Sequence, residues 1–177
     1  MKIVFTAIMF CAIGIGVCTT VFAQSREYKI KAEFLERFTR FIEWPDTAPA
    51  KSPSTTFHIC VIGQNPFGRY LADLTGEIKI QNKDVEVSNI TGPARIDGCE
   101  LLFIDKSEAS NLAAILSVTA NKPILTVADT VGFAEKGVLI NFYTAGDFIH
   151  FEINQAAAHK SRLRFSSRLL KLGRLVN

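Results

Sequence analysis

The spacing of apolar residues predicts a long amphipathic helix near the start of the chain, from Tyr28 to Trp44. Its apolar positions recur at helical spacing: Ile30, Phe34, Phe38, Phe41 and Ile42. Pro45 should end this helix, because the residue before a proline is pushed out of the α region. The aromatic stripe is therefore predicted to be core, and the charged remainder, Lys31 included, is predicted to face solvent.

Further along, short apolar or alternating runs predict strands. Buried strands are expected at Phe57–Gly63, Cys99–Ile104 and Pro123–Val127. Alternation on both sides of Asn82-Lys83 predicts one hairpin. The runs "GVLINFY" and "DFIHFEIN", separated by Thr144-Ala145-Gly146, predict a closing antiparallel hairpin.

Helix-capping residues lie between these strands. Asn65 with Pro66, Ser107, Asn154 and Ser166 are each placed to begin a helix. Strands and helices thus alternate, which predicts an α/β sandwich: a mixed, mostly parallel sheet flanked by helices. No repeat or low-complexity tract interrupts the pattern, so a single domain over residues 24–177 is expected.

The first 23 residues have the pattern of a secretory signal peptide. Lys2 precedes a largely apolar run, Ile3 to Val17, and Val21-Phe22-Ala23 forms a cleavage site. The run is short for a membrane span, which needs about 20 residues; an uncleaved anchor is the alternative. Cleavage would place a mature chain of 154 residues, 24–177, in the periplasm.

The mature chain has a nearly neutral charge balance. Removing Lys2 from the 20 basic residues leaves 19 against 17 acidic ones, which gives no support for nucleic-acid binding. The basic residues after Glu152 are not matched by acidic ones. This tail could meet an acidic partner or anionic lipid, or could simply be a solvated helix face.

Two of the four cysteines, Cys60 and Cys99, lie outside the leader. In an exported chain they can form one disulfide, with two buried free thiols as the alternative. The sequence contains no Cys-x-x-Cys, no clustered metal-ligand motif, no nucleophile elbow and no phosphate-binding glycine loop. We therefore expect no enzyme activity, no metal and no cofactor.

Two loops are candidates for binding a small ligand. The turn "GQNPFGRYL" could present backbone N–H groups, Asn65 and Arg69 to an anion, or could be an ordinary strand-to-helix turn. Asp129 ends a predicted parallel strand, where α/β proteins tend to bind ligands. These loops support an alternative function, that of a periplasmic ligand-binding or accessory protein for a sensor kinase or outer-membrane receptor.

Six segments in order give the chain a family resemblance. "IKAEFLERFTRFIEWP", "CVIGQNPFGRYL", "CELLFIDKSE", "ILTVADTVGFAEKGVLINF", "IHFEINQAAA" and "SSRLLKL" together resemble the YfiR family of periplasmic regulators, from about Tyr28 to Leu172. The resemblance implies an α/β regulator that tends to dimerise, and Cys60 and Cys99 match the family's cysteines. No second mature cysteine pair is present, although some relatives carry one.

The resemblance also implies a function and partners. A YfiR-like protein restrains a membrane-bound diguanylate cyclase by binding its periplasmic domain, and an outer-membrane lipoprotein relieves the restraint. Cyclic di-GMP and biofilm formation would then rise under envelope stress. For partner contact we select the exposed face of the first helix and the basic tail, represented by Arg37, Arg40 and Arg168.

Overall fold

The computed structural model describes residues 15–45 and 55–177, with side chains in the first helix described from Ser25 onward. Most of the predicted signal peptide, residues 1–14, lies outside the described residues. The helices are α1 (Ile15–Thr39), α2 (Tyr70–Thr75), α3 (Leu112–Thr119), α4 (Gln155–Lys160) and α5 (Ser167–Leu172). Two short 3-10 helices are η1 (Pro93–Arg95) and η2 (Lys106–Glu108). None of the helices in these described ranges is both long and apolar enough to cross a membrane.

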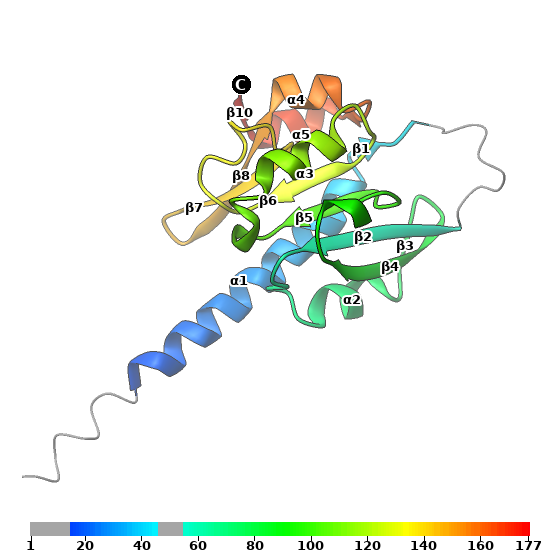
Figure 1. Ribbon diagram of the computed structural model, residues 1–177. Helices are drawn as coiled ribbons and strands as arrows, with labels where there is room; N and C mark the ends of the chain where they lie inside the picture. The colour runs from blue at the N-terminus through cyan, green and yellow to red at the C-terminus, as the bar shows by residue number, and fades with distance from the viewer. Residues whose placement is uncertain (1–14, 46–54) are drawn as a thin grey trace, which may run out of the picture.

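Within the described residues, eight strands form one sheet in the order β10-β8-β7-β6-β5-β2-β4-β3 (Figure 1). These strands are β2 (Thr56–Ile62), β3 (Lys79–Ile80), β4 (Lys83–Ile90), β5 (Leu101–Ile104), β6 (Leu125–Ala128), β7 (Ile140–Ala145), β8 (Phe148–Asn154) and β10 (Arg174–Val176). A separate antiparallel pair joins β1 (Ile42–Glu43) to β9 (Arg164–Phe165).

Five neighbouring strands, β4, β2, β5, β6 and β7, run parallel, and β3 and β8 flank them as antiparallel strands. The parallel strands follow the order of a doubly wound α/β sheet, with a switch point between β2 and β5. The predicted mixed, mostly parallel sheet flanked by helices, with its closing hairpin, is therefore confirmed.

Alternate strand residues enter two hydrophobic cores on opposite faces of the sheet. Phe57, Ile59 and Val61 of β2 pack in the core beneath α1, α2 and α5. Cys60 and Ile62 of the same strand pack in the core beneath α3. Because both faces are covered, the central strands are apolar at nearly every position, as the sequence predicted.

The first helix ends earlier than predicted, at Thr39 and not at Trp44. Turn hydrogen bonds follow, and Ile42 and Glu43 then pair with β9. Tertiary strand pairing, and not Pro45, therefore sets the end of α1. The predicted faces of the helix also need correction, since Lys31 is buried and Ile30 is 37 % exposed.

Two predicted caps are wrong as helix caps. Asn65 closes a turn and α2 begins only at Tyr70. Ser107 lies within η2, where Asp105 is the capping residue, and α3 begins at Leu112. Gly63 explains the close packing here: its φ is +93°, and a Cβ atom would lie 2.5 Å from the Ser107 Oγ atom.

The other turns follow the sequence closely. The β3–β4 hairpin turns at Gln81-Asn82, one residue before the predicted position, with both φ angles positive as a type I′ turn requires. Asn154 and Ser166 cap α4 and α5 as predicted, accepting hydrogen bonds from the N–H groups of Ala157 and Leu169. Strand β10 was not predicted.

Candidate partner surface and strand-edge cluster

A buried polar cluster lies where β6 ends at the carboxyl edge of the sheet. The Asp129 carboxylate accepts hydrogen bonds from Lys31 Nζ at 2.6 Å and from the Tyr28 hydroxyl at 2.8 Å. The side chains of Lys31 and Asp129 are each only 6 % exposed. Glu27, one turn before Lys31, adds a second carboxylate at 2.5 Å. The cluster ties α1 to the sheet at the edge where ligands often bind in this type of fold.

Burial and the neighbouring Asp129 carboxylate raise the pKa of Tyr28 far above its ordinary value. Both effects disfavour a phenolate, so Tyr28 remains a hydrogen-bond donor to Asp129 throughout the neutral range. Its ring also packs edge-on against Phe67, at 5.5 Å between centroids. One oxygen of the Asp129 carboxylate, Oδ2, is thus bonded from within the protein by both a cation and a phenol.

The two other ligand candidates are engaged locally or exposed. Asn65 Oδ1 accepts a hydrogen bond from the N–H of Phe67 at 2.9 Å, and its Nδ2 donates to the carbonyl of Gly68. The Arg69 side chain is 93 % exposed and lies 3.9 Å from Asp73. Neither residue forms a hydrogen bond or ion pair with Asp129 within the described residues, and a ligand site at Asn65, Arg69 and Asp129 stays a prediction.

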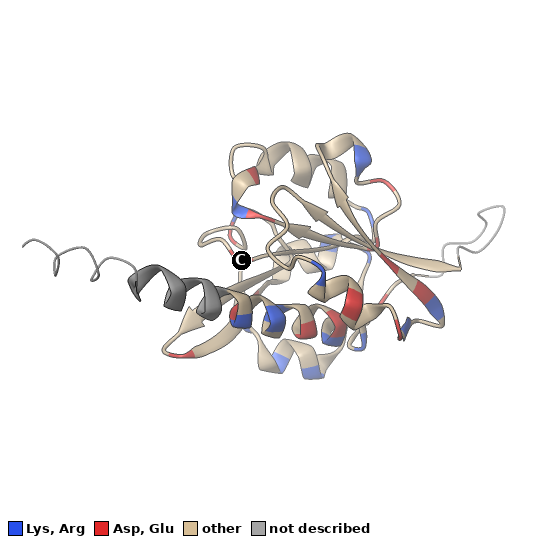
Figure 2. Ribbon diagram, turned by 90° about the horizontal axis from the view of Figure 1, so that it is seen from below, with Lys and Arg blue, Asp and Glu red and all other residues tan. Residues whose placement is uncertain are grey.

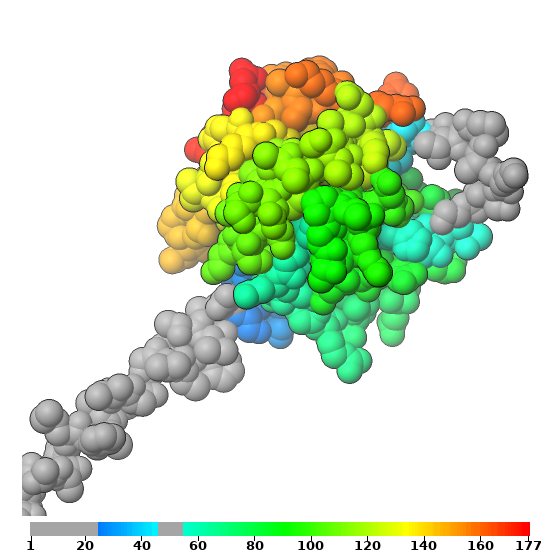
Figure 3. All heavy atoms as spheres, in the orientation of Figure 1, coloured from blue at the N-terminus to red at the C-terminus, as the bar shows by residue number. Residues whose placement is uncertain are grey.

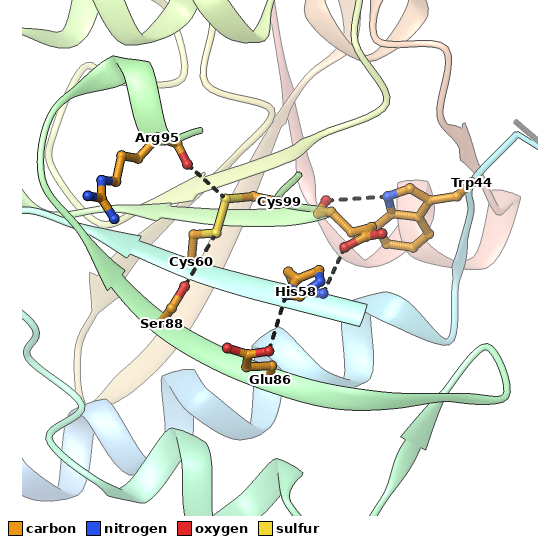
Figure 4. The surroundings of a disulfide bond; sticks show 8 residues. Trp44, His58, Cys60, Glu86, Ser88, Arg95 and Cys99 are labelled. Atoms are coloured by element: carbon orange, nitrogen blue, oxygen red, sulfur yellow. Dashed lines mark hydrogen bonds and ion pairs between the residues drawn. A yellow bond between two sulfur atoms is a disulfide. The ribbon is translucent and has the colours of Figure 1, made fainter. Parts of the chain in front are cut away.

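A disulfide joins Cys60 in β2 to Cys99 just before β5, with a Cα–Cα distance of 5.9 Å (Figure 4). Both residues are buried. Close by, Trp44 Nε1 donates a hydrogen bond to the carbonyl oxygen of Glu100, and its ring packs edge-on against Phe57. The disulfide ties β2 to the start of β5, and Trp44 holds the segment after α1 against the same region.

The exposed side of α1 carries the first two partner-contact candidates. A groove of about 390 Å³ lies between α1 and α2; its lining residues are Glu33, Glu36, Arg37, Arg40, Phe41 and Leu74. The Arg40 Nε atom lies 2.7 Å from Glu36 Oε1, one turn earlier. Arg37 has no ion pair within the described residues. Figure 2 shows both basic and acidic residues along this helix.

Arg168, the third candidate, is on α5 beside the end of α1. The N–H of Ser166, the cap of α5, donates to the carbonyl of Phe41 at 2.9 Å, and β9 pairs with β1 directly before it. Arg168 is exposed and has no ion pair within the part of the chain that the structure describes. The fold thus places Arg37, Arg40 and Arg168 on neighbouring elements, which we call the α1–α5 surface.

The sequence interpretation missed the cluster built by Tyr28 and Lys31. Lys31 was assigned to the solvent face because charged residues usually lie there, but it is 4 % exposed. Its spacing from Glu27, four residues earlier, indicated an ion pair on one helix face. The partner 98 residues away, Asp129, depends on the packing of α1 against β6 and has no local signal.

The described residues contain no group of three or more His, Cys, Asp or Glu side chains that could hold a metal ion. The histidines are dispersed. His58 of β2 lies 3.7 Å from the exposed Glu86 side chain of β4, and the ring of His150 stacks on that of Tyr143 with 5.4 Å between centroids. The described structure is thus a doubly wound sheet with an internally bonded strand-edge cluster and exposed arginines on neighbouring helices.

Comparison with known proteins identifies the family. A model of the YfiR/HmsC-like family matches residues 28–174, and the chain belongs to that family. It is a family of regulatory proteins associated with periplasmic control of cyclic di-GMP signalling. A search of curated proteins found no match.

Proposed function

We propose that this protein is exported to the periplasm, is cut after Ala23, and restrains an inner-membrane diguanylate cyclase by binding its periplasmic domain. The observation that supports the proposal most directly is the YfiR/HmsC-like match over nearly the whole mature chain. An outer-membrane lipoprotein would relieve the restraint by competing for the regulator. Cyclic di-GMP output would then follow the state of the envelope.

The α1–α5 surface is the proposed contact site. Arg37 and Arg168 are exposed, and neither is neutralised by an ion pair within the described residues. Arginine suits protein interfaces because its planar guanidinium can bind a carboxylate through two hydrogen bonds. The partly buried Phe41 and Leu74 line the adjoining groove and provide apolar contact area. An acidic, partly apolar surface on the cyclase would complement this arrangement.

Deleting the gene tests the proposed restraint. Intracellular cyclic di-GMP should rise in the deletion strain and return to its original level when the gene is restored. An unchanged level would exclude control of a cyclase under the conditions used. Biofilm mass is the matching physiological readout.

Charge reversal tests the proposed surface separately from the restraint. The triple variant Arg37→Glu, Arg40→Glu and Arg168→Glu should weaken binding to the periplasmic domain of the cyclase by at least tenfold, because three attractions become repulsions. Arg95→Glu, on η1 over the α3 face of the sheet, is the matched control and should bind normally. Partner binding that survives all three reversals would place the interface elsewhere.

We propose further that the protein is a homodimer. The support is the family resemblance, and the measurement is the mass of the purified mature chain by light scattering. A monomer over the micromolar range would contradict this part of the proposal without affecting the proposed binding of the cyclase.

A further inference from the structure

A cavity lies at the amino end of β6, the opposite edge of the sheet from Asp129. It has a volume of about 440 Å³, is partly open to solvent, and is lined by the end of α3, the start of β6, the loop before β7, and α4. In the space-filling view the yellow-green residues of α3 adjoin the orange residues of α4 at the surface (Figure 3). The volume is within the range of about 300–1,000 Å³ that is usual for small-molecule sites.

The inner wall of the cavity combines apolar side chains with polar groups that are hydrogen-bonded within the protein. Leu116, Ile124, Leu139 and Ala157 contribute side chains to it. The Thr126 hydroxyl oxygen already accepts a hydrogen bond from the N–H of Leu139 at 3.0 Å. A ligand therefore meets hydrocarbon here, and a polar group placed at this depth would lose its hydrogen bonds to water.

Asn154 is a second polar residue of the wall that is engaged internally. Its Nδ2 donates to the carbonyl of Ala134 at 2.7 Å, and its Oδ1 accepts from the N–H of Ala157 at 2.7 Å. The amide oxygen of Asn154 thus caps α4, and its amide nitrogen holds the loop before β7. The Asn154 side chain therefore has a structural role in the cavity wall. A polar group of a ligand would have to be bound by other residues.

Two lysines at the margin of the cavity could contact a charged group of a ligand. Lys136, in the loop before β7, and Lys160, at the end of α4, both line the cavity and are exposed. Neither forms an ion pair with any described residue, although Lys136 lies 5.8 Å from the ring of Phe133. Glu135 is the only acidic side chain among the lining residues, which also include the last residue, Asn177.

We propose that this cavity binds a small organic anion with an apolar body, such as a carboxylate on a chain of about eight carbons or on an aromatic ring. The apolar part would lie against Leu116, Ile124 and Leu139, and the anionic group would face Lys136 and Lys160. The proposal goes beyond restraint of a cyclase. It concerns residues that are not part of the α1–α5 surface, so either proposal can fail without the other.

Octanoate is the probe for this site, and acetate and octanol are its controls. Titration calorimetry and thermal unfolding of the mature protein should show saturable octanoate binding with a Kd on the order of 1 mM or below. Acetate lacks the apolar body and octanol lacks the charge, so each should bind at least tenfold more weakly. No octanoate binding up to ten times that concentration, or equal binding of octanol, would overturn the proposal.

Variants locate the site. Ala156 lines the cavity from an exposed position on α4, so Ala156→Trp should fill the cavity without disturbing the core and should abolish octanoate binding. Lys136→Ser combined with Lys160→Ser should weaken binding about tenfold. Lys171→Ser, an exposed lysine on α5, is the matched control and should bind as the parent does. Unchanged binding in the tryptophan variant or in the double lysine variant would contradict the assignment.

Discussion

The carboxyl and amino edges of the central sheet differ in whether their charged side chains are bonded within the protein. At the carboxyl edge, Asp129, Lys31 and Tyr28 are buried and bonded to one another, and they hold α1 in place. At the amino edge, an apolar cavity lies between α3 and α4, and the lysines at its margin have no ion-pair partner within the described residues. A doubly wound sheet usually binds ligands at the carboxyl edge. In this protein that edge serves to attach α1, and the cavity lies at the other end.

This difference has an energetic cause. A buried carboxylate must be paired, because taking an isolated charge out of water costs several kcal/mol. Lys31 and Tyr28 supply this pairing to the Asp129 carboxylate. Exposed lysines remain hydrated and carry no such requirement, so they are free to meet an incoming anion.

The largest expected loss of stability comes from removing the disulfide. Cys60→Ser should lower the free energy of unfolding by about 4 kcal/mol in oxidising buffer, since the bond closes a loop with a sequence separation of 39 residues. Denaturant unfolding followed by the fluorescence of Trp44, the only tryptophan, provides the measurement. Reductant should destabilise the parent similarly and leave Cys60→Ser unchanged. Equal unfolding midpoints for the parent with and without reductant would show that the bond contributes no stability.

A somewhat smaller effect is expected from breaking the cluster at the carboxyl edge. Asp129→Ala should cost about 3 kcal/mol, because it leaves Lys31 buried with only the half-exposed Glu27 as counterion. Urea unfolding gives the value. The double variant Asp129→Ala with Lys31→Met removes both charges and should recover part of the loss. If the double variant is no more stable than the single one, an unpaired buried lysine is not the cause.

The architecture could be predicted from the sequence because its signals are local. Apolar runs in β2, β5 and β6 and the capping residues Asn154 and Ser166 each act within a few neighbouring residues. The end of α1 could not be predicted in the same way. It depends on the pairing of Ile42 with Phe165, residues far apart in the sequence.

The candidate sites were harder to predict than the fold. Arg37, Arg40 and Arg168 were selected as exposed basic residues, and their placement on adjoining elements follows from the β1–β9 pairing. Asp129 was selected for its position at a strand end, but its engagement depends on a lysine 98 residues away. The cavity at the amino edge had no sequence signal, because it is formed where α3 and α4 fail to fill the space between them.

Raising the pH should lower the free energy of unfolding gradually, through the ionisation of Tyr28 at the carboxyl edge. The pKa of Tyr28 is higher in the folded protein than in the unfolded chain, so the folded state keeps this proton where the unfolded state loses it. Stability from this group is therefore fully present below about pH 10 and falls above it, by up to about 1.4 kcal/mol per pH unit. Urea unfolding between pH 9 and 11 measures the slope.

Tyr28→Phe is the matched control for that slope, since it keeps the ring packed on Phe67 and removes the ionisable group. The variant should be less stable than the parent at pH 7, because Asp129 loses a hydrogen bond, and the difference should narrow as the pH rises. A parent and variant that lose stability in parallel above pH 10 would assign the alkaline loss to other groups.

The smallest expected effect on stability distinguishes Asn65 from Arg69, the two loop residues that the sequence analysis proposed as ligand-binding groups. Asn65→Ala removes two side-chain hydrogen bonds within the turn and should cost about 1 kcal/mol. Arg69→Ala alters a side chain that is 93 % exposed and should leave urea unfolding unchanged. Neither substitution should affect octanoate binding, because both residues lie at the carboxyl edge. A loss of octanoate binding in either variant would mean that the carboxyl edge retains binding capacity, and the contrast between the two edges would then be wrong.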